Sequence, residues 1–538
     1  MEFQSLFRRK TTSGLPEEGG DGYLQDGLHK VLNVRDLTFF GIAAIIGAGS
    51  FSSMGEACYS GGPGVIFLFI ICAIACGFTA LCYAEFASRV KGGGSAYTYA
   101  YVTFGELFAW IIGWALLMEY SIGNIYVAFS WSGYFTSLLD ALGWHIPEWL
   151  SINYRAAHEA FLTQTPGRGL VAWQQAPVIG QLHLVLDLPA LMINTLITWL
   201  VYVGIKESRN LSNGVVIVKL LIILLVLVVG AFYVDIANWT PFAPNGFGGI
   251  MKGVSAVFFA YIGFDAISTL SEEAKNPQRD LPRGMIYSLI VCTILYILLS
   301  LVLTGMVSFK SLGVNDPLAE VFKLRQVKWM LFIISIAAVF AMTSVLLVFQ
   351  MGQPRIWLSM SRDGLLPKKF SSIHPKFKTP DFATIITGLV VGVPILFTDE
   401  KFVLDFTSIG TLFAFLLVCG GVLLLPPKTP TPNTFNLPYI NGKYIYPVGL
   451  AIGYGFIFYF YPNWLNTTPL LVFFIFSLGL GVFTFIRNFS LIPVLGLFSC
   501  SYLLTGMGST NWIWFLSWLL LGLVIYFSYS RKRSKLNV

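Results

Sequence analysis

The stretch FFGIAAIIGAGSFSS (residues 39–53) decides the fold, because it is apolar enough to cross a membrane and yet contains Gly41, Gly47 and Gly49. Glycine weakens a helix interior, so this run predicts a membrane helix that is interrupted. An interruption frees backbone N–H and C=O groups, which are costly in lipid unless a ligand, water or a neighbouring helix satisfies them. The stretch therefore indicates either a binding site at a helix break or a small-residue surface for helix packing.

The composition of the whole chain is that of a membrane protein. Of 538 residues, 56% are hydrophobic and 11% are charged, and the mean hydropathy is +0.72. These values exclude a soluble multidomain protein of this size. The net charge of +7 is interpreted as cytoplasmic loop charge, and we expect no nucleic-acid partner. The seven cysteines have no metal-ligand spacing, so we expect packing residues, with no metal and no disulfide framework.

Apolar runs long enough to cross a bilayer predict about fourteen spans, which are, in residue numbers, 36–58, 63–88, 104–139, 183–205, 212–234, 249–271, 284–307, 329–359, 381–398, 402–426, 444–462, 467–486, 490–507 and 510–529. An even number of spans puts both termini on one side. With the termini in the cytoplasm, inside segments hold 24 Lys and Arg and outside loops hold 8. This asymmetry predicts a multi-pass protein of the cell membrane with both termini cytoplasmic.

The chain contains no linker of disordered composition, so it is expected to form one membrane domain with short tails. The predicted parts are a cytoplasmic tail over 1–35, a core over 36–426, additional spans over 444–529 and a basic tail over 530–538. The longest loop, 140–182, contains three tryptophans and is expected to cap the outer surface. It contains no cysteine, so we expect no disulfide-linked extracellular subunit.

A second break is expected in the sixth span, where Gly263 and Asp265 lie within GVSAVFFAYIGFDAISTLSEEAKNP. Spans one and six are equivalent if the first ten form two repeats of five, 36–234 and 249–426. An odd number of spans per repeat inverts the second repeat, and the two broken helices then face each other near the bilayer midplane. Freed N–H groups suit a carboxylate and freed carbonyls suit an ammonium, and an α-amino acid carries both. The matching break favours a site over simple packing.

Four strings resemble the amino acid, polyamine and organocation transporter superfamily, in particular its cationic amino acid transporter branch, with bacterial-type permeases: IIGAGSF (45–51), GGGSAYTYAY (92–101), FFAYIGFDAISTLSEEAKNPQRDLPRG (258–284) and MTSVLLVFQMGQPRIWLSMSRDGLLPKKFSSIHPKFKTP (342–380). The resemblance implies an all-α fold of the LeuT type, with a five-plus-five inverted repeat and discontinuous helices 1 and 6. About fourteen transmembrane helices also resemble this branch.

The resemblance also implies the substrate-binding residues. The carboxylate would meet the amides of Ala48 and Gly49, with Ser50 close by, and the ammonium would meet the carbonyls of Ile45, Phe259 and Ile262. Phe259 also resembles an aromatic gate, and Asn124 resembles a polar residue that meets the substrate side chain. Tyr120 shares the face of Asn124, one turn earlier. The full expected set is Ile45, Gly47, Ala48, Gly49, Ser50, Tyr120, Asn124, Phe259 and Ile262.

Five further polar residues lie in predicted spans. Lys219 matches a lysine that occupies the sodium position in proton-coupled relatives, so it is expected to couple transport to protons, although it could instead snorkel to the interface. Glu119 and Asp265 could recognise a side chain, line the pathway, pair with Lys219 or be structural. Thr343 and Ser344 resemble hydroxyls of a vestigial ion site, or they could satisfy helix carbonyls.

The function that follows is secondary active transport of an amino acid, by proton-coupled symport and alternating access. An exchanger with the same site, and a membrane receptor that binds an amino acid without moving it, stay open. An enzyme is not expected, because all five histidines lie in tails or loops or at a span edge. The expected partners are an amino acid, protons and the lipid bilayer, with no cofactor.

Overall fold

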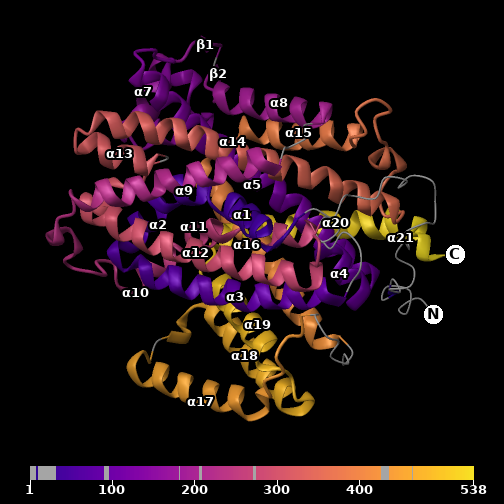
Figure 1. The fold of residues 1–538 in the computed structure, drawn as a ribbon. Coiled ribbons are helices and arrows are strands. Elements are labelled where there is room, and N and C mark those ends of the chain that lie inside the picture. Colours follow the sequence, from indigo (N-terminus) through magenta and orange to yellow (C-terminus); the bar gives the residue numbers. More distant parts are fainter. Residues whose placement is uncertain are drawn as a thin grey trace.

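Helices make up almost all of the regular secondary structure that the computed structural model describes (Figure 1). It describes residues 8–9, 32–89, 96–180, 182–204, 209–270, 274–314, 316–425, 435–462 and 464–537. Most of the expected tail 1–35 lies outside the described residues. The prediction of an all-α membrane protein is confirmed at the level of class, and the one described sheet is a hairpin of two short strands.

The first half of the chain contains nine α-helices and the hairpin in its described part: α1 (Val34–Ile45), α2 (Met54–Gly61), α3 (Val65–Arg89), α4 (Ala96–Thr103), α5 (Glu106–Ala141), α6 (Tyr154–Leu162), α7 (Arg168–Gln175), β1 (Val178–Ile179), β2 (Leu182–His183), α8 (Leu188–Val203) and α9 (Arg209–Ala231). The second half has α10 (Gly246–Lys252), α11 (Val254–Tyr261), α12 (Pro277–Met306), α13 (Pro317–Leu324), α14 (Lys328–Arg362), α15 (Asp381–Ile395), α16 (Glu400–Leu424), α17 (Gly442–Phe460), α18 (Thr468–Arg487), α19 (Leu491–Leu504), α20 (Ser509–Ile525) and α21 (Arg531–Arg533).

Many of these helices have the length and composition of membrane spans. Among the described residues, 7 helices are long and apolar enough to cross a membrane, or 8 if the bent pair Gly246–Lys252 and Val254–Ser268 forms one span. Four shorter apolar helices add to them. A helix overlaps each of the fourteen ranges expected from the sequence, but the number of spans itself stays a prediction.

Helices far apart in the sequence pack together in the centre of the bundle. The long helix α5 packs against α14 and α16, α3 packs against α12, and α8 packs against α15. The helix α1 packs against α12 and against the short 3₁₀ helix Phe264–Leu270 that follows α11. In Figure 1, α17 and α18 (orange) lie at one edge of this bundle, below α19.

Both predicted breaks are present. The helix α1 ends at Ile45, and after a short interruption a π-helix runs over Gly49–Ser53 into α2. The helix α11 ends at Tyr261, and Gly263, with φ +117°, separates it from Phe264–Leu270. A φ of this sign favours glycine. The two helices are therefore interrupted at the positions that the sequence analysis expected.

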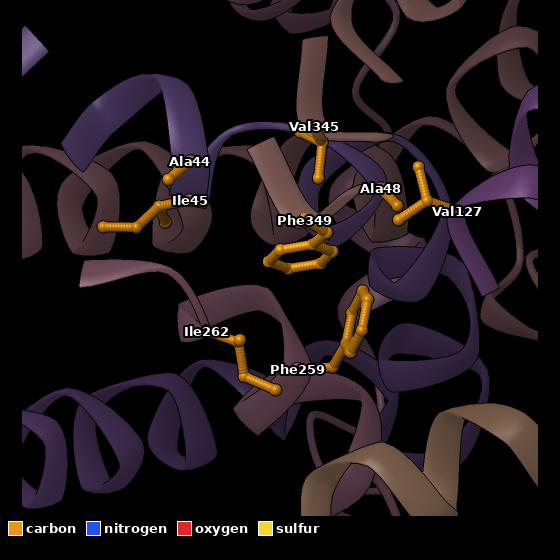
Figure 2. Close-up of a pocket in the computed structure, with 9 residues that line it drawn as sticks. Ala44, Ile45, Ala48, Val127, Phe259, Ile262, Val345 and Phe349 are labelled. Carbon is orange, nitrogen blue, oxygen red and sulfur yellow. The ribbon is translucent and has the colours of Figure 1, made fainter. Parts of the chain in front are cut away.

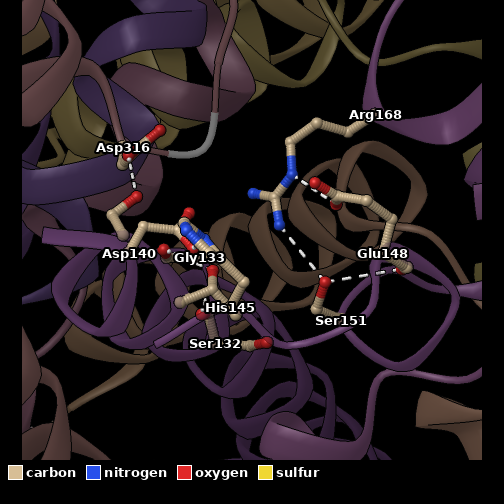
Figure 3. Close-up of polar contacts among 10 residues, drawn as sticks. Ser132, Gly133, Asp140, His145, Glu148, Ser151, Arg168 and Asp316 are labelled. Atoms are coloured by element: carbon tan, nitrogen blue, oxygen red, sulfur yellow. Dashed lines mark hydrogen bonds and ion pairs between the residues drawn. The ribbon is translucent and has the colours of Figure 1, made fainter. Parts of the chain in front are cut away.

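Residues 140–180 and 182–183 form a structured cap over one end of the bundle, which we call the cap end (Figure 1). It contains α6, α7, β1 and β2. The Arg168 side chain donates to Glu148 Oε2 at 2.7 Å and to the Ser151 hydroxyl at 3.2 Å (Figure 3). The cap therefore has internal hydrogen bonds of its own, whereas the sequence predicted only a loop there.

Candidate functional site

A small cavity lies between the two helix breaks. Its volume is about 10 Å³, which is room for about one water molecule. In Figure 2 the rings of Phe259 and Phe349 lie close together beside it. An amino acid could enter only if these side chains moved. The complete lining is Ala44, Ile45, Ala48, Gly49, Val127, Phe259, Ile262, Val345 and Phe349, and five of these nine were expected from the sequence.

The glycines of the first break permit close approach of neighbouring helices. A Cβ on Gly49 would lie 2.7 Å from the Cα of Ala260, and one on Gly47 would lie 2.3 Å from Val345 Cγ2. Real Cβ atoms do not come this close to other heavy atoms, so any larger residue would push the helices apart. Gly47 itself does not line the cavity and serves this packing with α14.

One hydroxyl group joins the two breaks. Tyr296, on α12, donates its hydroxyl to the carbonyls of Ile45 and Ala260, at 2.9 Å each. The Ile45 carbonyl, which the resemblance assigned to the substrate ammonium, therefore already has a partner. The Phe259 carbonyl likewise accepts from the Ile262 N–H at 3.1 Å. In this conformation the carbonyls of Ile45 and Phe259 accept hydrogen bonds from protein groups and not from a substrate.

Ser50 also satisfies its polar groups locally. Its backbone N–H and its hydroxyl both donate to the Gly47 carbonyl, at 3.1 Å each. Ser50 is fully buried and does not line the cavity. Its hydroxyl thus stabilises the turn at the break. Of the three residues expected near the substrate carboxylate, only Ala48 and Gly49 line the cavity.

Asn124, on α5, is fully buried, and neither of its side-chain polar atoms has a hydrogen-bond partner among the described residues. A buried amide without partners costs free energy, so such a group points to water or a ligand. Tyr120, one turn earlier, packs edge-on against Phe349, with ring centroids 5.5 Å apart. Neither residue lines the cavity, but Phe349 connects Tyr120 to it.

Lys219, on α9, is buried with an exposed fraction of 3%. Its ammonium donates to the carbonyls of Ala43 and Ile46, at 3.4 and 3.3 Å, and to the Ser344 hydroxyl at 2.6 Å. The carbonyls at the end of α1 lack the next helical turn, and a cation is a favourable partner for them. These contacts lie inside the bundle, so they differ from snorkelling to the interface.

The two hydroxyls of α14 point in different directions. Ser344 contacts Lys219, whereas the Thr343 hydroxyl accepts from Trp131 Nε1 at 3.0 Å and donates to the Val339 carbonyl at 2.7 Å. Successive residues on a helix are rotated by about 100°, which accounts for the difference. The structure therefore brings only Ser344 to the lysine, and Thr343 links α14 to α5.

Glu119 and Asp265 are both buried away from the cavity lining. The Cβ of Glu119 lies against Gly410 of α16. The Asp265 carboxylate accepts from the Gly263 N–H at 3.3 Å, so it satisfies a backbone group freed by the second break. The three hydrogen bonds of the Lys219 ammonium described above go to α1 and α14.

Sequence reasoning missed four lining residues and one neighbour of the gate. Ala44, Val127, Val345 and Phe349 complete the cavity wall. Tyr126 packs edge-on against Phe259, with ring centroids 4.6 Å apart. Val127 follows Asn124 by three residues on the same helix face, and this spacing was a usable signal. The others lie in apolar runs whose inward face only the tertiary structure defines.

A closed cavity between two broken helices, inside a bundle of apolar membrane helices, is the arrangement of a membrane transporter. The comparisons with known proteins agree. Residues 32–485 match the amino acid permease family, and residues 490–534 match the C-terminal region of the same permeases. The chain belongs to the amino acid permease family, within the amino acid, polyamine and organocation superfamily that the sequence predicted, and it is a transporter rather than an enzyme.

Similar proteins occur in bacteria and plants. The chain is 40% identical to the branched-chain amino acid permease BcaP of Bacillus subtilis (strain 168), over 99% of each chain. It is 37% identical to the methylthioribose transporter of the same organism, again over 99% of each. It is also 37% identical to the chloroplastic cationic amino acid transporter 9 of Arabidopsis thaliana, over 74% of this chain and 67% of the relative.

Proposed function

We propose that the chain imports an L-amino acid with an apolar side chain of small or medium size, together with a proton, by alternating access. The observation that carries this proposal is the cavity between the two breaks, because all nine of its lining residues are apolar. An apolar wall favours burial of an apolar side chain and disfavours a charged one. The relative named as a branched-chain amino acid permease supports the same substrate class.

Within this proposal, the substrate carboxylate meets the amides at Ala48 and Gly49, and the ammonium displaces the Tyr296 hydroxyl at Ile45 or takes the carbonyls of Phe259 and Ile262. The side chain then occupies the space between Val127, Val345 and Phe349 after the aromatic rings move. Asn124 and Tyr120 meet the substrate or a bound water. Gly47 and Ser50 maintain the backbone geometry of the break.

Proton coupling in the proposal depends on Lys219. The protonated ammonium holds the end of α1 and Ser344 of α14 together, and loss of the proton weakens this connection. Because α1 and α14 both contribute to the cavity wall, the state of the lysine alters the shape of the substrate site. Thr343, Glu119 and Asp265 have structural roles in this scheme, through Trp131, α16 and the second break.

The proposed architecture is a five-plus-five inverted repeat, with repeats 36–234 and 249–426 and fourteen spans in all. It is supported by packing between equivalent helices of the two halves, namely α3 with α12, α5 with α14 and α8 with α15. The two broken segments also contact each other, α1 with Phe264–Leu270 and α11 with Gly49–Ser53. Equivalent elements meet in this way when they lie near a common two-fold axis. The cap end then faces outside, and both termini are cytoplasmic.

Reconstitution of the purified protein tests the function. Proteoliposomes are loaded with unlabelled leucine, and entry of labelled leucine, arginine or methylthioribose is measured with and without an inward proton gradient. We expect counterflow of leucine, little entry of the other two compounds, and net accumulation that requires the gradient. Counterflow without gradient-driven net uptake into vesicles that hold no leucine would indicate an exchanger, and binding without counterflow would indicate a receptor. Either result contradicts symport.

A further inference from the structure

Glu400, the first residue of α16, joins three elements at the cap end of the bundle. Its Oε1 accepts from the Ser52 hydroxyl at 3.1 Å and from the Ser130 hydroxyl at 3.3 Å. Ser52 belongs to the π-helix after the first break, and Ser130 belongs to α5. Glu400 was absent from the residues expected from the sequence, because it lies at the edge of an apolar run.

The contacts of Glu400 lead directly to the cavity. The Tyr126 hydroxyl donates to the Ser52 hydroxyl at 3.3 Å, and the Tyr126 ring packs against Phe259, which lines the cavity. Tyr134 adds a hydrogen bond to the Phe51 carbonyl at 2.5 Å. Opening the cavity toward the cap end would require the π-helix and α5 to separate, and this would break the contacts of Glu400.

The second oxygen of Glu400, Oε2, is buried and has no hydrogen-bond partner within the described ranges. A carboxylate with one oxygen in this state is costly, since water is lost and no donor replaces it. A proton removes the charge. When the contacts open and water enters, the ionised form becomes favourable again.

The charged groups around Glu400 favour the neutral acid as well. Asp187, before α8, and Glu56, on α2, both repel its negative charge. Asp187 accepts from the Ser132 hydroxyl at 2.6 Å, which holds it beside α5, the helix that carries Ser130. Arg155, on the adjoining cap helix α6, forms an ion pair with Asp399 at 2.8 Å. Its positive charge is therefore paired with the Asp399 carboxylate and not with Glu400.

We propose that Glu400 is a second proton-binding site, which takes up a proton when the cap end closes over the cavity and releases it when that end opens. The proposal rests on the proposed transport function, and it adds a proton site on α16 to the one proposed at Lys219 on α9. Closure of the cap end is then favoured at low external pH, in the direction that proton-coupled uptake requires.

A cysteine reporter at the cavity wall tests this without any substrate. Val127→Cys places a thiol that a membrane-impermeant methanethiosulfonate reagent reaches from the cap end only when that end is open. The labelling rate is measured in proteoliposomes between pH 5.5 and 8, in the parent and with Glu400→Gln. The ratio of the two rates cancels the ionisation of the thiol itself.

We expect the ratio of parent rate to Glu400→Gln rate to rise with pH, by up to about tenfold per pH unit for one coupled proton. Glu400→Asp keeps an ionisable group and should retain the dependence, and Glu159→Gln, an exposed carboxylate of α6, should leave it unchanged. A ratio that is flat with pH overturns the proton site. Because labelling needs no substrate, that result differs from a failure of leucine counterflow, which would overturn the proposed function.

If Glu400→Gln does not fold, as judged by gel filtration, the labelling of the Glu400→Asp protein still decides the question. Shortening the side chain by one carbon lengthens the contacts with Ser52 and Ser130 and should shift the midpoint of its pH dependence relative to the parent. An identical profile in both proteins would show that the carboxyl does not report closure, and it would contradict the proposal.

Discussion

Replacing Lys219 with methionine keeps the length of the side chain and removes its charge and its donors. The variant Lys219→Met loses the contacts with Ala43, Ile46 and Ser344, of which the last is the shortest at 2.6 Å. It leaves two carbonyls at the end of α1 without this partner in the interior of the bundle. The change therefore acts directly on the end of α1 next to the cavity.

The size of the effect follows from these contacts. A hydrogen bond from a charged donor contributes about 1.5–3 kcal/mol, and the two carbonyl contacts are long, so we expect a total loss of about 2–3 kcal/mol. If the contacts exist mainly in the substrate-binding conformation, this loss weakens apparent substrate affinity by roughly 30- to 150-fold. Ser344→Ala removes one contact and should have a smaller effect, about tenfold or less.

Two assays check this prediction. Equilibrium binding of labelled leucine to purified protein gives the affinity, and uptake into proteoliposomes with an imposed proton gradient gives the pH dependence. Lys219→Met should weaken binding and remove the response to the gradient, while gel filtration reports a folded protein. Unchanged affinity together with an unchanged response to pH would refute the role of Lys219 in both binding and coupling.

Three other predictions concern the breaks and the cap. Gly49→Ala should lower leucine uptake at least about tenfold, because its Cβ would lie 2.7 Å from the Cα of Ala260 and overpacking costs about 1–3 kcal/mol. The control variant Gly479→Ala, whose Cβ would meet nothing within 4 Å, should transport normally. Equal uptake by both variants would contradict this prediction. Tyr296→Phe should lower the melting temperature without substrate, because the carbonyls of Ile45 and Ala260 lose a donor at a cost of about 1–3 kcal/mol. Saturating leucine should restore part of this loss in a thermal-shift assay. A loss that leucine does not reduce would argue against binding of the substrate ammonium at these carbonyls. Burial raises the pKa of the Asp316 carboxyl, which lies directly before α13 and accepts from the Ser137 hydroxyl of α5 (Figure 3). The contribution of Asp316 to the stability of the fold is therefore present below its unfolded pKa of about 4 and is lost as pH rises through its folded pKa. The melting temperature of Asp316→Asn minus that of the parent should then be larger at pH 7 than at pH 4. The opposite order would show that the sign of this pKa argument is wrong.

The sequence predicted the helices well, because membrane spans depend on local composition. Both breaks were also predictable, since Gly47, Gly49 and Gly263 lie in largely apolar runs that occupy equivalent places in the two halves of the chain. Most helix ends differ from the expected ranges by a few residues, where capping and tertiary contacts decide the last turn, but α12 begins at Pro277, seven residues before the expected start at 284.

Tertiary contacts were harder to predict. Nothing in the apolar run of α12 distinguishes Tyr296 from other aromatic residues, and yet its hydroxyl joins the two breaks. Thr343 and Ser344 are adjacent and chemically alike, and only the helix rotation separates their partners. Glu400 lies at the end of a span, where a charge usually contacts water, and only the tertiary structure shows that Ser52 and Ser130 donate to it.

The Tyr296 hydroxyl carries one hydrogen but faces two carbonyl oxygens, at Ile45 and Ala260. At any instant it can donate fully to one of them, and the other oxygen is left short of a donor. The ammonium group of a substrate has three N–H donors. One of them can donate to the carbonyl oxygen that lacks a full hydrogen bond, while the Tyr296 hydroxyl donates to the other carbonyl oxygen. An ammonium that binds here would therefore leave each of the two carbonyls with a donor, which keeps the energetic barrier to substrate binding low.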